Sequence, residues 1–190
     1  MIKKGEVLFV EDKLLMIPLL ITVTFGVILS VKTFPKQYTV NLEGVKYQLG
    51  AENNHFMEPI TICIDGKLQQ SLTGSKTFKG TTDIDDEKIP VPEDQRGLEI
   101  KFQDDGGGHI VYGYFENGRP GTYGYGVLYT NSNFSEVTIA TFQKDKTDLS
   151  NRGWTSENGQ MITAPAANRT EALKISNELM QVYLKGHSLK

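Results

Sequence analysis

The stretch ITICI, at residues 60–64, places an isoleucine at every second position. Successive side chains of a strand point to opposite faces, so the three isoleucines share one face and predict a half-buried β-strand. We interpret Cys63, on the same strand, as a small buried hydrophobic residue. Asp65-Gly66 follows at once and predicts a two-residue hairpin turn, with KLQQSL (residues 67–72) as the return strand.

Further short runs with strand character flank this stretch on both sides. They are rich in β-branched and aromatic residues and recur roughly every 10 to 15 residues, with turn-forming residues between them. This spacing predicts a mainly β fold, either a curved antiparallel sheet or a β-sandwich. The runs are YTVNL (38–42), KTFKGTTDID (76–85), LEIKF (98–102), HIVYGYF (109–115), YGYGVLYT (123–130), EVTIATF (136–142) and QMITA (160–164).

One α-helix is expected at the end of the chain, over about residues 169–185. Residues 168–171, NRTE, resemble a capping box, in which the Asn168 side chain accepts from first-turn N–H groups. Gly186 lies where a C-terminal stop is expected. An apolar stripe at helical spacing predicts that the helix covers one face of the sheet, with partner binding as the alternative. The stripe is formed by Ala172, Ile175, Leu179 and Val182.

Composition excludes several classes of protein. The chain has 190 residues, a formal net charge of −3 and a pI near 5.7. These values exclude a strongly basic nucleic-acid binder, so we expect no nucleic-acid partner. The single cysteine excludes an internal disulfide and a cysteine-rich metal site.

An apolar stretch precedes the β-rich region. Residues 14–31, LLMIPLLITVTFGVILSV, carry no charge and are bounded by Lys13 and Lys32. As a helix they would extend about 27 Å, close to the hydrocarbon thickness of a bilayer. The following residues lack the small-residue pattern of a cleavage site, which favours an uncleaved signal anchor over a cleaved signal peptide.

The expected organisation follows from this anchor. Residues 1–13 form a cytoplasmic tail, 14–32 a transmembrane signal anchor, 33–37 a tether, and 38–190 an extracytoplasmic β-rich domain. Lysines are evenly balanced on the two sides of the span, so the positive-inside rule alone does not decide. The free amino terminus favours a cell-membrane protein with its N-terminus inside and its C-terminal domain outside.

Acidic residues are concentrated in residues 83–105, which hold nine acidic and three basic side chains. Converging carboxylates can bind a hard cation such as Ca²⁺, but the spacing of an EF-hand loop is absent. We therefore interpret the segment as a solvated loop and keep a metal site as the alternative. The candidate ligands are Asp83, Asp85, Asp86 and Glu87.

The run DDGGGH at residues 104–109 is a second candidate. Its glycines do not match a phosphate-binding loop, because the lysine and the following helix are missing. Asp104, Asp105 and His109 could form an acid/base or metal group, which suggests a hydrolase or metal-dependent enzyme as the alternative function. No G-x-S-x-G nucleophile motif occurs in the chain.

Residues 106–129 hold eight glycines and six aromatic residues. A four-residue loop at 118–121 would pair Tyr114 with Tyr125 and predicts a continuous tyrosine stripe, whereas another loop length would lay tyrosines over glycines. An exposed stripe would suit a sugar ring or an extended peptide, and a buried stripe would be core. We hypothesise the four-residue loop. The candidate ligand-binding residues are Tyr112, Tyr114, Tyr123, Tyr125 and Tyr129.

Two of these stretches together resemble a known group. They are LTGSKTFKGTTDID (72–85) and GYGVLYTNSNFSEVTIATF (124–142), which occur here after a single apolar span. The chain resembles small, single-pass, membrane-anchored β-rich proteins of Gram-positive bacteria such as bacilli. The shared segment G-x-x-x-F-x-G-x-x-x-I corresponds to Gly74, Phe78, Gly80 and Ile84. The resemblance implies an envelope location and a similar architecture, and it implies no catalytic or ligand residues.

These observations lead to one expected function. The anchor, the absence of a convincing catalytic motif and the Gly/Tyr-rich segment favour a binding or scaffolding module over an enzyme. We expect the lipid bilayer as one partner, a cell-wall glycan or another envelope protein as the ligand, and no cofactor.

Overall fold

The computed structural model describes residues 33–144 and 152–190. The described part is mainly β, with one eight-stranded sheet, one two-stranded sheet and helices at the C-terminal end. The strands are β1 (Lys36–Gln48), β2 (Met57–Gln70), β3 (Lys76–Ile84), β4 (Leu98–Lys101), β5 (Gly108–Glu116), β6 (Arg119–Thr130), β7 (Val137–Thr141), β8 (Gln143–Lys144), β9 (Arg152–Gly153) and β10 (Gln160–Ala164). The helices are the 3₁₀ turns η1 (Ala51–Asn53) and η2 (Glu93–Gln95), then α2 (Arg169–Leu179) and α3 (Gln181–Leu184).

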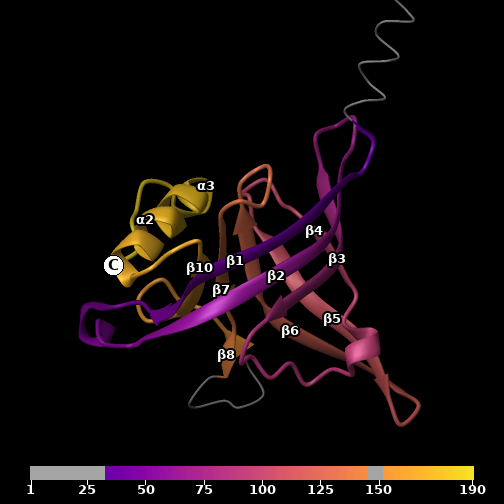
Figure 1. Ribbon diagram of the computed structural model, residues 1–190, viewed down its shortest axis with the longest axis horizontal. Coiled ribbons are helices and arrows are strands. Elements are labelled where there is room, and N and C mark those ends of the chain that lie inside the picture. Colours follow the sequence, from indigo (N-terminus) through magenta and orange to yellow (C-terminus); the bar gives the residue numbers. More distant parts are fainter. Residues whose placement is uncertain (1–32, 145–151) are drawn as a thin grey trace, which may run out of the picture.

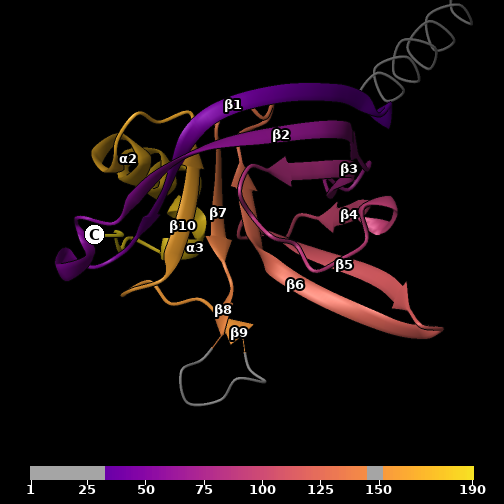
Figure 2. The ribbon, with the colours of Figure 1, turned by 60° about the horizontal axis from the view of Figure 1, so that its bottom comes forward.

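The large sheet is a nearly closed antiparallel barrel (Figures 1 and 2). Its order is β4-β3-β2-β1-β10-β7-β6-β5, so most neighbours are consecutive in the chain and β1 joins β10. The two ends of this order, β4 and β5, meet at an isolated bridge between Phe102 and Gly108. The expected curved antiparallel sheet is thus confirmed, in preference to two packed sheets.

The predicted membrane span falls outside this description. No helix within residues 33–144 and 152–190 is both long and apolar enough to cross a bilayer. The expected span at residues 14–32 precedes the first described residue, so it stays a prediction.

The barrel interior is filled by alternate residues of its strands. Ile60, Ile62 and Ile64 are 8 %, 0 % and 1 % exposed and belong to the inner core, as the alternation predicted. Cys63 occupies an outward position of β2 and is half-buried, with its Sγ 3.6 Å from Asn41 Oδ1. The interpretation of Cys63 as a buried residue was therefore wrong, because alternation turns it away from the isoleucines.

The predicted hairpin at Asp65-Gly66 does not form. Strand β2 runs through both residues, and 67–72 is no return strand, since the chain reverses at residues 71–75. Gly66 lies opposite Gly80 in β3, and a Cβ on Gly66 would stand 2.6 Å from the Phe78 ring. Gly66 allows two strands to approach closely. The dipeptide Asp-Gly alone does not distinguish this role from a turn.

The β5–β6 hairpin turns at Asn117-Gly118 and not through a four-residue loop. Both residues have positive φ, 51° and 75°, as a two-residue hairpin turn of the primed type requires. The register therefore places Tyr114 opposite Gly121, with a bulge near Ile110. The predicted pairing with Tyr125 was wrong because Asn-Gly is the stronger turn signal.

Helix α2 packs on the outer faces of β1, β7 and β10. Asn168 caps it as expected, since its Oδ1 accepts from Glu171 N–H at 3.0 Å. The buried face differs from the predicted stripe, because Val182 is 62 % exposed while Ile175 and Leu179 are half-buried. The helix ends at Leu179 and α3 begins at Gln181, so a single periodicity does not continue through both. The buried residues are Ala172, Ser176, Met180 and Leu184.

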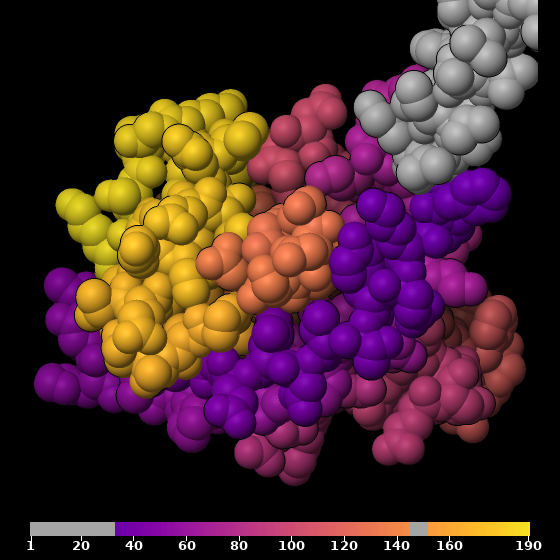
Figure 3. All heavy atoms as spheres, turned by 45° about the horizontal axis from the view of Figure 1, so that its top comes forward, coloured from indigo at the N-terminus to yellow at the C-terminus, as the bar shows by residue number. Residues whose placement is uncertain are grey.

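We call the end of the barrel at which β1 begins the entry end. It gathers the turns at residues 71–75 and 103–107 and the connection at residues 131–136. Tyr38 donates to the Ser132 carbonyl at 3.3 Å, which ties β1 to that connection. In Figure 3 the start of β1 (indigo), this connection (orange) and the C-terminal helices (yellow) lie side by side.

Candidate functional site

The tight turn between β4 and β5 organises the candidate site. Gln103 N–H donates to the Gly107 carbonyl at 2.8 Å, and Gly106 N–H donates to the Gln103 carbonyl at 3.0 Å. Asp105 Oδ1 accepts from Gly107 N–H at 2.9 Å, which fixes the Asp105 carboxylate against the turn. The consecutive glycines thus form a compact turn, with Gly106 at a φ of 84°. A pocket lies on each side of it.

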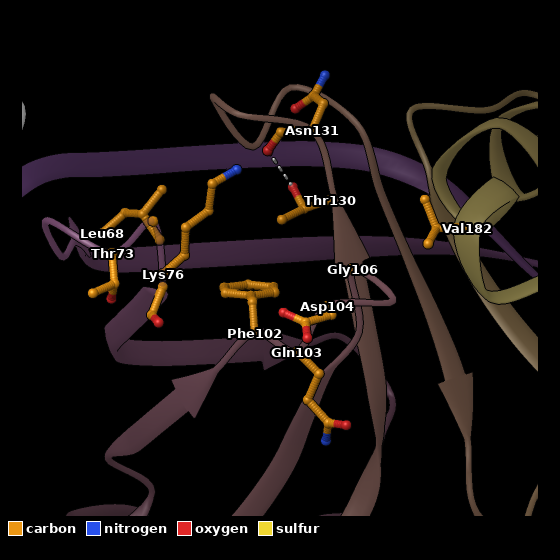
Figure 4. Close-up of a pocket in the computed structure, with 12 residues that line it drawn as sticks. Leu68, Thr73, Lys76, Phe102, Gln103, Asp104, Gly106, Thr130, Asn131 and Val182 are labelled. Atoms are coloured by element: carbon orange, nitrogen blue, oxygen red, sulfur yellow. Dashed lines mark hydrogen bonds between the residues drawn. The ribbon is translucent and has the colours of Figure 1, made fainter.

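The first pocket, which we call the mouth pocket, opens at the entry end and has a volume of about 370 Å³. Its walls come from the turn at 71–75, the turn at 103–106 and the start of the β6–β7 connection. Figure 4 shows the Phe102 ring at its centre, between Lys76 and Asp104. Leu68 and Val182 supply the remaining large apolar lining.

Several polar side chains of the mouth pocket have no partner within the described ranges. Lys76, Gln103 and Asp104 make no side-chain hydrogen bond or ion pair to any residue of 33–144 or 152–190. Asn131, by contrast, uses its side chain within its own turn, where Nδ2 donates to Ser135 Oγ at 2.8 Å. Lys76 and Asp104, on either side of the aromatic ring, and Gln103 in the pocket wall are therefore available to a ligand.

The second pocket, which we call the aromatic pocket, lies on the outer face of the sheet and has a volume of about 220 Å³. Its aromatic walls are His109 of β5, Tyr129 of β6, Phe142 after β7, Trp154 after β9 and Tyr183 of α3. Asp105, Gly107 and Ala140 also line the aromatic pocket.

The structure separates the predicted acid/base group. Asp104 lines the mouth pocket, whereas Asp105 and His109 line the aromatic pocket. Across the described ranges His109 forms no hydrogen bond or ion pair with either carboxylate, and its ring lies 6.2 Å from that of Phe142. Asp104 and Asp105 therefore line different pockets, on the two sides of the turn.

The predicted cation ligands are also dispersed. Asp83 is exposed on β3, and Asp85 and Asp86 are exposed where that strand ends. Glu87 is engaged by Lys46, with Nζ to Oε1 at 2.6 Å. In residues 33–144 and 152–190 no three His, Cys, Asp or Glu side chains are placed to hold a metal ion.

The five candidate tyrosines do not form a stripe. Tyr112 and Tyr125 lie in the inner core at 1 % and 3 % exposure, and Tyr114 and Tyr123 are half-buried against it. Burial raises the pKa of Tyr112 to about 12, with a smaller contribution from the Asp83 carboxylate. Only Tyr129 faces the outer side, where it lines the aromatic pocket.

Sequence reasoning missed the residues that gather here. Phe102, Phe142, Trp154 and Tyr183 come from separate elements, and no local motif links them. The signal that was present, the glycine run at 106–108, was considered as a phosphate-binding loop, which it does not match.

Comparison of the chain with protein-family models, with curated proteins and with solved structures finds no match in any of the three. The functional argument therefore depends on the two pockets themselves.

Proposed function

We propose that this protein is a membrane-anchored binding module of the cell envelope that holds a glycan in the mouth pocket. The observation that supports the proposal is the Phe102 ring between Lys76 and Asp104, in a pocket that Gln103 also lines, where none of these three polar side chains pairs with a described residue. An aromatic face offers contact area at low entropic cost, and the three polar groups include both donors and acceptors. Sugar rings present an apolar face edged by hydroxyls, which matches this arrangement.

The position of the pocket also supports a binding role. Its polar residues lie in and beside turns that the barrel holds in place, as is common for binding sites on rigid scaffolds. At the far hairpin, by contrast, Phe115 is 67 % exposed and lines none of the described pockets.

The proposed anchor places the pocket near the bilayer. Lys36, the first residue of β1, is paired with Leu68, a residue that lines the mouth pocket. If residues 14–32 span the membrane, the entry end is the part of the barrel closest to the lipid surface. The ligand expected on this arrangement is a glycan that reaches the membrane, with the barrel outside the cell.

Calorimetry on the full chain in nanodiscs tests the glycan site. A peptidoglycan disaccharide of N-acetylglucosamine and N-acetylmuramic acid is titrated into the wild type and into Phe102→Ala. We expect about tenfold weaker binding for the variant, because the stacking surface is lost. The matched control Phe115→Ala removes an exposed phenylalanine at the other end and should bind within about twofold of the wild type.

A second variant guards against misfolding of Phe102→Ala. Asp104→Asn keeps size and shape and should weaken disaccharide binding about threefold, as expected for one exposed polar contact. Absence of disaccharide binding by the wild type, or equal loss in Phe102→Ala and Phe115→Ala, would contradict the glycan site.

Protease treatment of intact cells tests the topology separately. The proposal expects external protease to degrade residues 33–190 while a tag on the N-terminus stays protected. Protection of the β-domain in intact cells, with degradation only after lysis, would refute the proposed orientation without bearing on the glycan site.

A further inference from the structure

The aromatic pocket has walls that come from five separate parts of the chain. The Tyr129 and Tyr183 rings lie 5.9 Å apart, Trp154 and Tyr183 lie 6.2 Å apart, and so do His109 and Phe142. Interplanar angles of 59°, 62° and 44° show that these rings are inclined to one another. They form the sides of a concave pocket and not a flat stacking platform.

Small residues keep this space open. Ala140 is the one β7 residue that lines it, and Gly107 lies at its edge. A Cβ on Gly107 would stand 2.9 Å from Val127 Cγ1 and 3.1 Å from the Tyr129 ring. The glycine therefore allows the turn to lie directly against the tyrosine.

While His109 is neutral, the only charge in the lining is negative. Asp105 is the only carboxylate among the lining residues, and no lysine or arginine is among them. Its position is fixed by the bond from Gly107 N–H. Burial raises the pKa of Tyr129, and Asp105 and Tyr183 act in the same direction, so the phenol stays neutral at physiological pH.

From this geometry we propose that the aromatic pocket binds the head of a small organic cation, of the trimethylammonium class, between its rings and Asp105. Ring faces carry negative charge density and attract such cations. The Asp105 carboxylate at the edge complements the positive charge of the ligand. A trimethylammonium head is less strongly hydrated than a bare metal ion, so it can enter a pocket lined by rings. The site lies across the turn from the mouth pocket, shares only Gln103 of its lining with that pocket, and does not depend on glycan binding.

Trp154 allows direct measurement, because it is the only tryptophan of the chain. The full chain is placed in nanodiscs of phosphatidylglycerol, and choline and tetramethylammonium are titrated while Trp154 fluorescence is followed. The titrations are run at about pH 8, where imidazoles are largely neutral. We expect saturable changes with both cations and at least about tenfold weaker binding of 3,3-dimethylbutanol, the neutral isostere of choline.

Two neighbouring aspartates provide a matched pair of variants. Asp105→Asn retains the acceptor for Gly107 N–H and removes the charge, so choline binding should weaken by about three- to tenfold. Asp104→Asn removes the same charge on the other side of the turn and should bind choline within about twofold of the wild type. Tyr183→Leu, at a residue that is 41 % exposed, should weaken choline binding without loss of fold.

The outcomes are decisive in both directions. Equal binding of the neutral isostere, equal effects of Asp104→Asn and Asp105→Asn, or no saturable change with either cation would overturn the proposal. Nanodiscs that contain phosphatidylcholine distinguish the source of the cation. Occupancy from these nanodiscs would identify a lipid headgroup, and occupancy by free choline alone would identify a soluble ligand, so either result supports the site.

Discussion

The two faces of the barrel sheet are built differently. The inner face is closed by side chains such as Phe78, Ile100 and Leu128, each fully buried. The outer face is covered by α2 on one part and hollowed at the aromatic pocket on another. The inner face therefore accounts for the stability of the fold, while the outer face and the entry end hold the space in which a ligand can bind.

Polar chemistry also differs between the faces. Under α2, Ser176 Oγ lies 2.8 Å from each of three hydroxyls, those of Tyr47, Thr138 and Thr163. Thr138 and Thr163 are themselves 2.6 Å apart. This buried hydroxyl cluster satisfies its members mutually, so the helix is held by a directional network as well as by apolar contact.

The largest expected effect is at the inner face, with Phe78→Ala. The ring is fully buried, lies 5.3 Å from that of Phe134 and packs over Gly66, so its removal leaves a cavity. We expect the free energy of unfolding to fall by about 3–5 kcal/mol in denaturant titrations. Phe115→Ala, at an exposed position, should change it by less than about 0.5 kcal/mol. A loss below about 1 kcal/mol for Phe78→Ala would contradict a closed interior.

Alkaline pH should lower the free energy of unfolding through Tyr112, a residue of the inner face. The pKa of Tyr112 is about 12 in the folded chain, above the ordinary value of 10.0, so the unfolded chain loses this proton first. Its contribution to stability is complete below about pH 10 and is lost as pH rises towards 12, with a total near 2–3 kcal/mol. Unfolding titrations at intervals across this range should show a smaller decline in Tyr112→Phe. If the free energy of unfolding falls equally in the wild type and in Tyr112→Phe, the pKa of Tyr112 is not raised in the folded chain.

The hydroxyl cluster is the next test, with Ser176→Ala. Removing its oxygen leaves three buried hydroxyls short of a partner, which we expect to cost about 1–3 kcal/mol of unfolding free energy. Ser156→Ala, at an exposed serine, is the matched control. If the two variants are equally stable, the cluster contributes nothing and apolar packing alone holds α2.

The same contrast explains what the sequence could predict. Alternation located the strands, because it depends on residues two positions apart in one segment, as in residues 60–64. Asp65-Gly66 and Asn117-Gly118 are both typical turn dipeptides, yet Gly66 lies opposite Gly80 within paired strands, whereas Asn117-Gly118 forms a true turn. No local pattern encodes that pairing.

The candidate pockets could not be predicted from the sequence. The aromatic pocket combines residues as far apart in the chain as His109 and Tyr183, and the mouth pocket combines Lys76 with Asp104. The mouth pocket depends on closure of the barrel, which brings β4 and β5 together. The aromatic pocket depends on α3 and the segment after β9 lying against β5, β6 and β7. The sequence indicated the aromatic and acidic residues available and could not indicate which of them meet.

The smallest expected effect concerns the attachment of the helix, tested with Asn168→Ala. Asn168 Oδ1 accepts from Glu171 N–H, and Glu171 Oε2 in turn accepts from Ala167 N–H at 2.9 Å. Loss of this cap should lower the free energy of unfolding by about 1 kcal/mol, because first-turn donors lose their partner. Asn168→Asp keeps an acceptor and adds a favourable charge at the helix start, so it should retain or exceed the stability of the wild type. Since the aromatic pocket uses Tyr183 of α3, fraying at the start of α2 should leave choline binding nearly unchanged, and a parallel loss of binding would mean that helix and pocket form one cooperative unit.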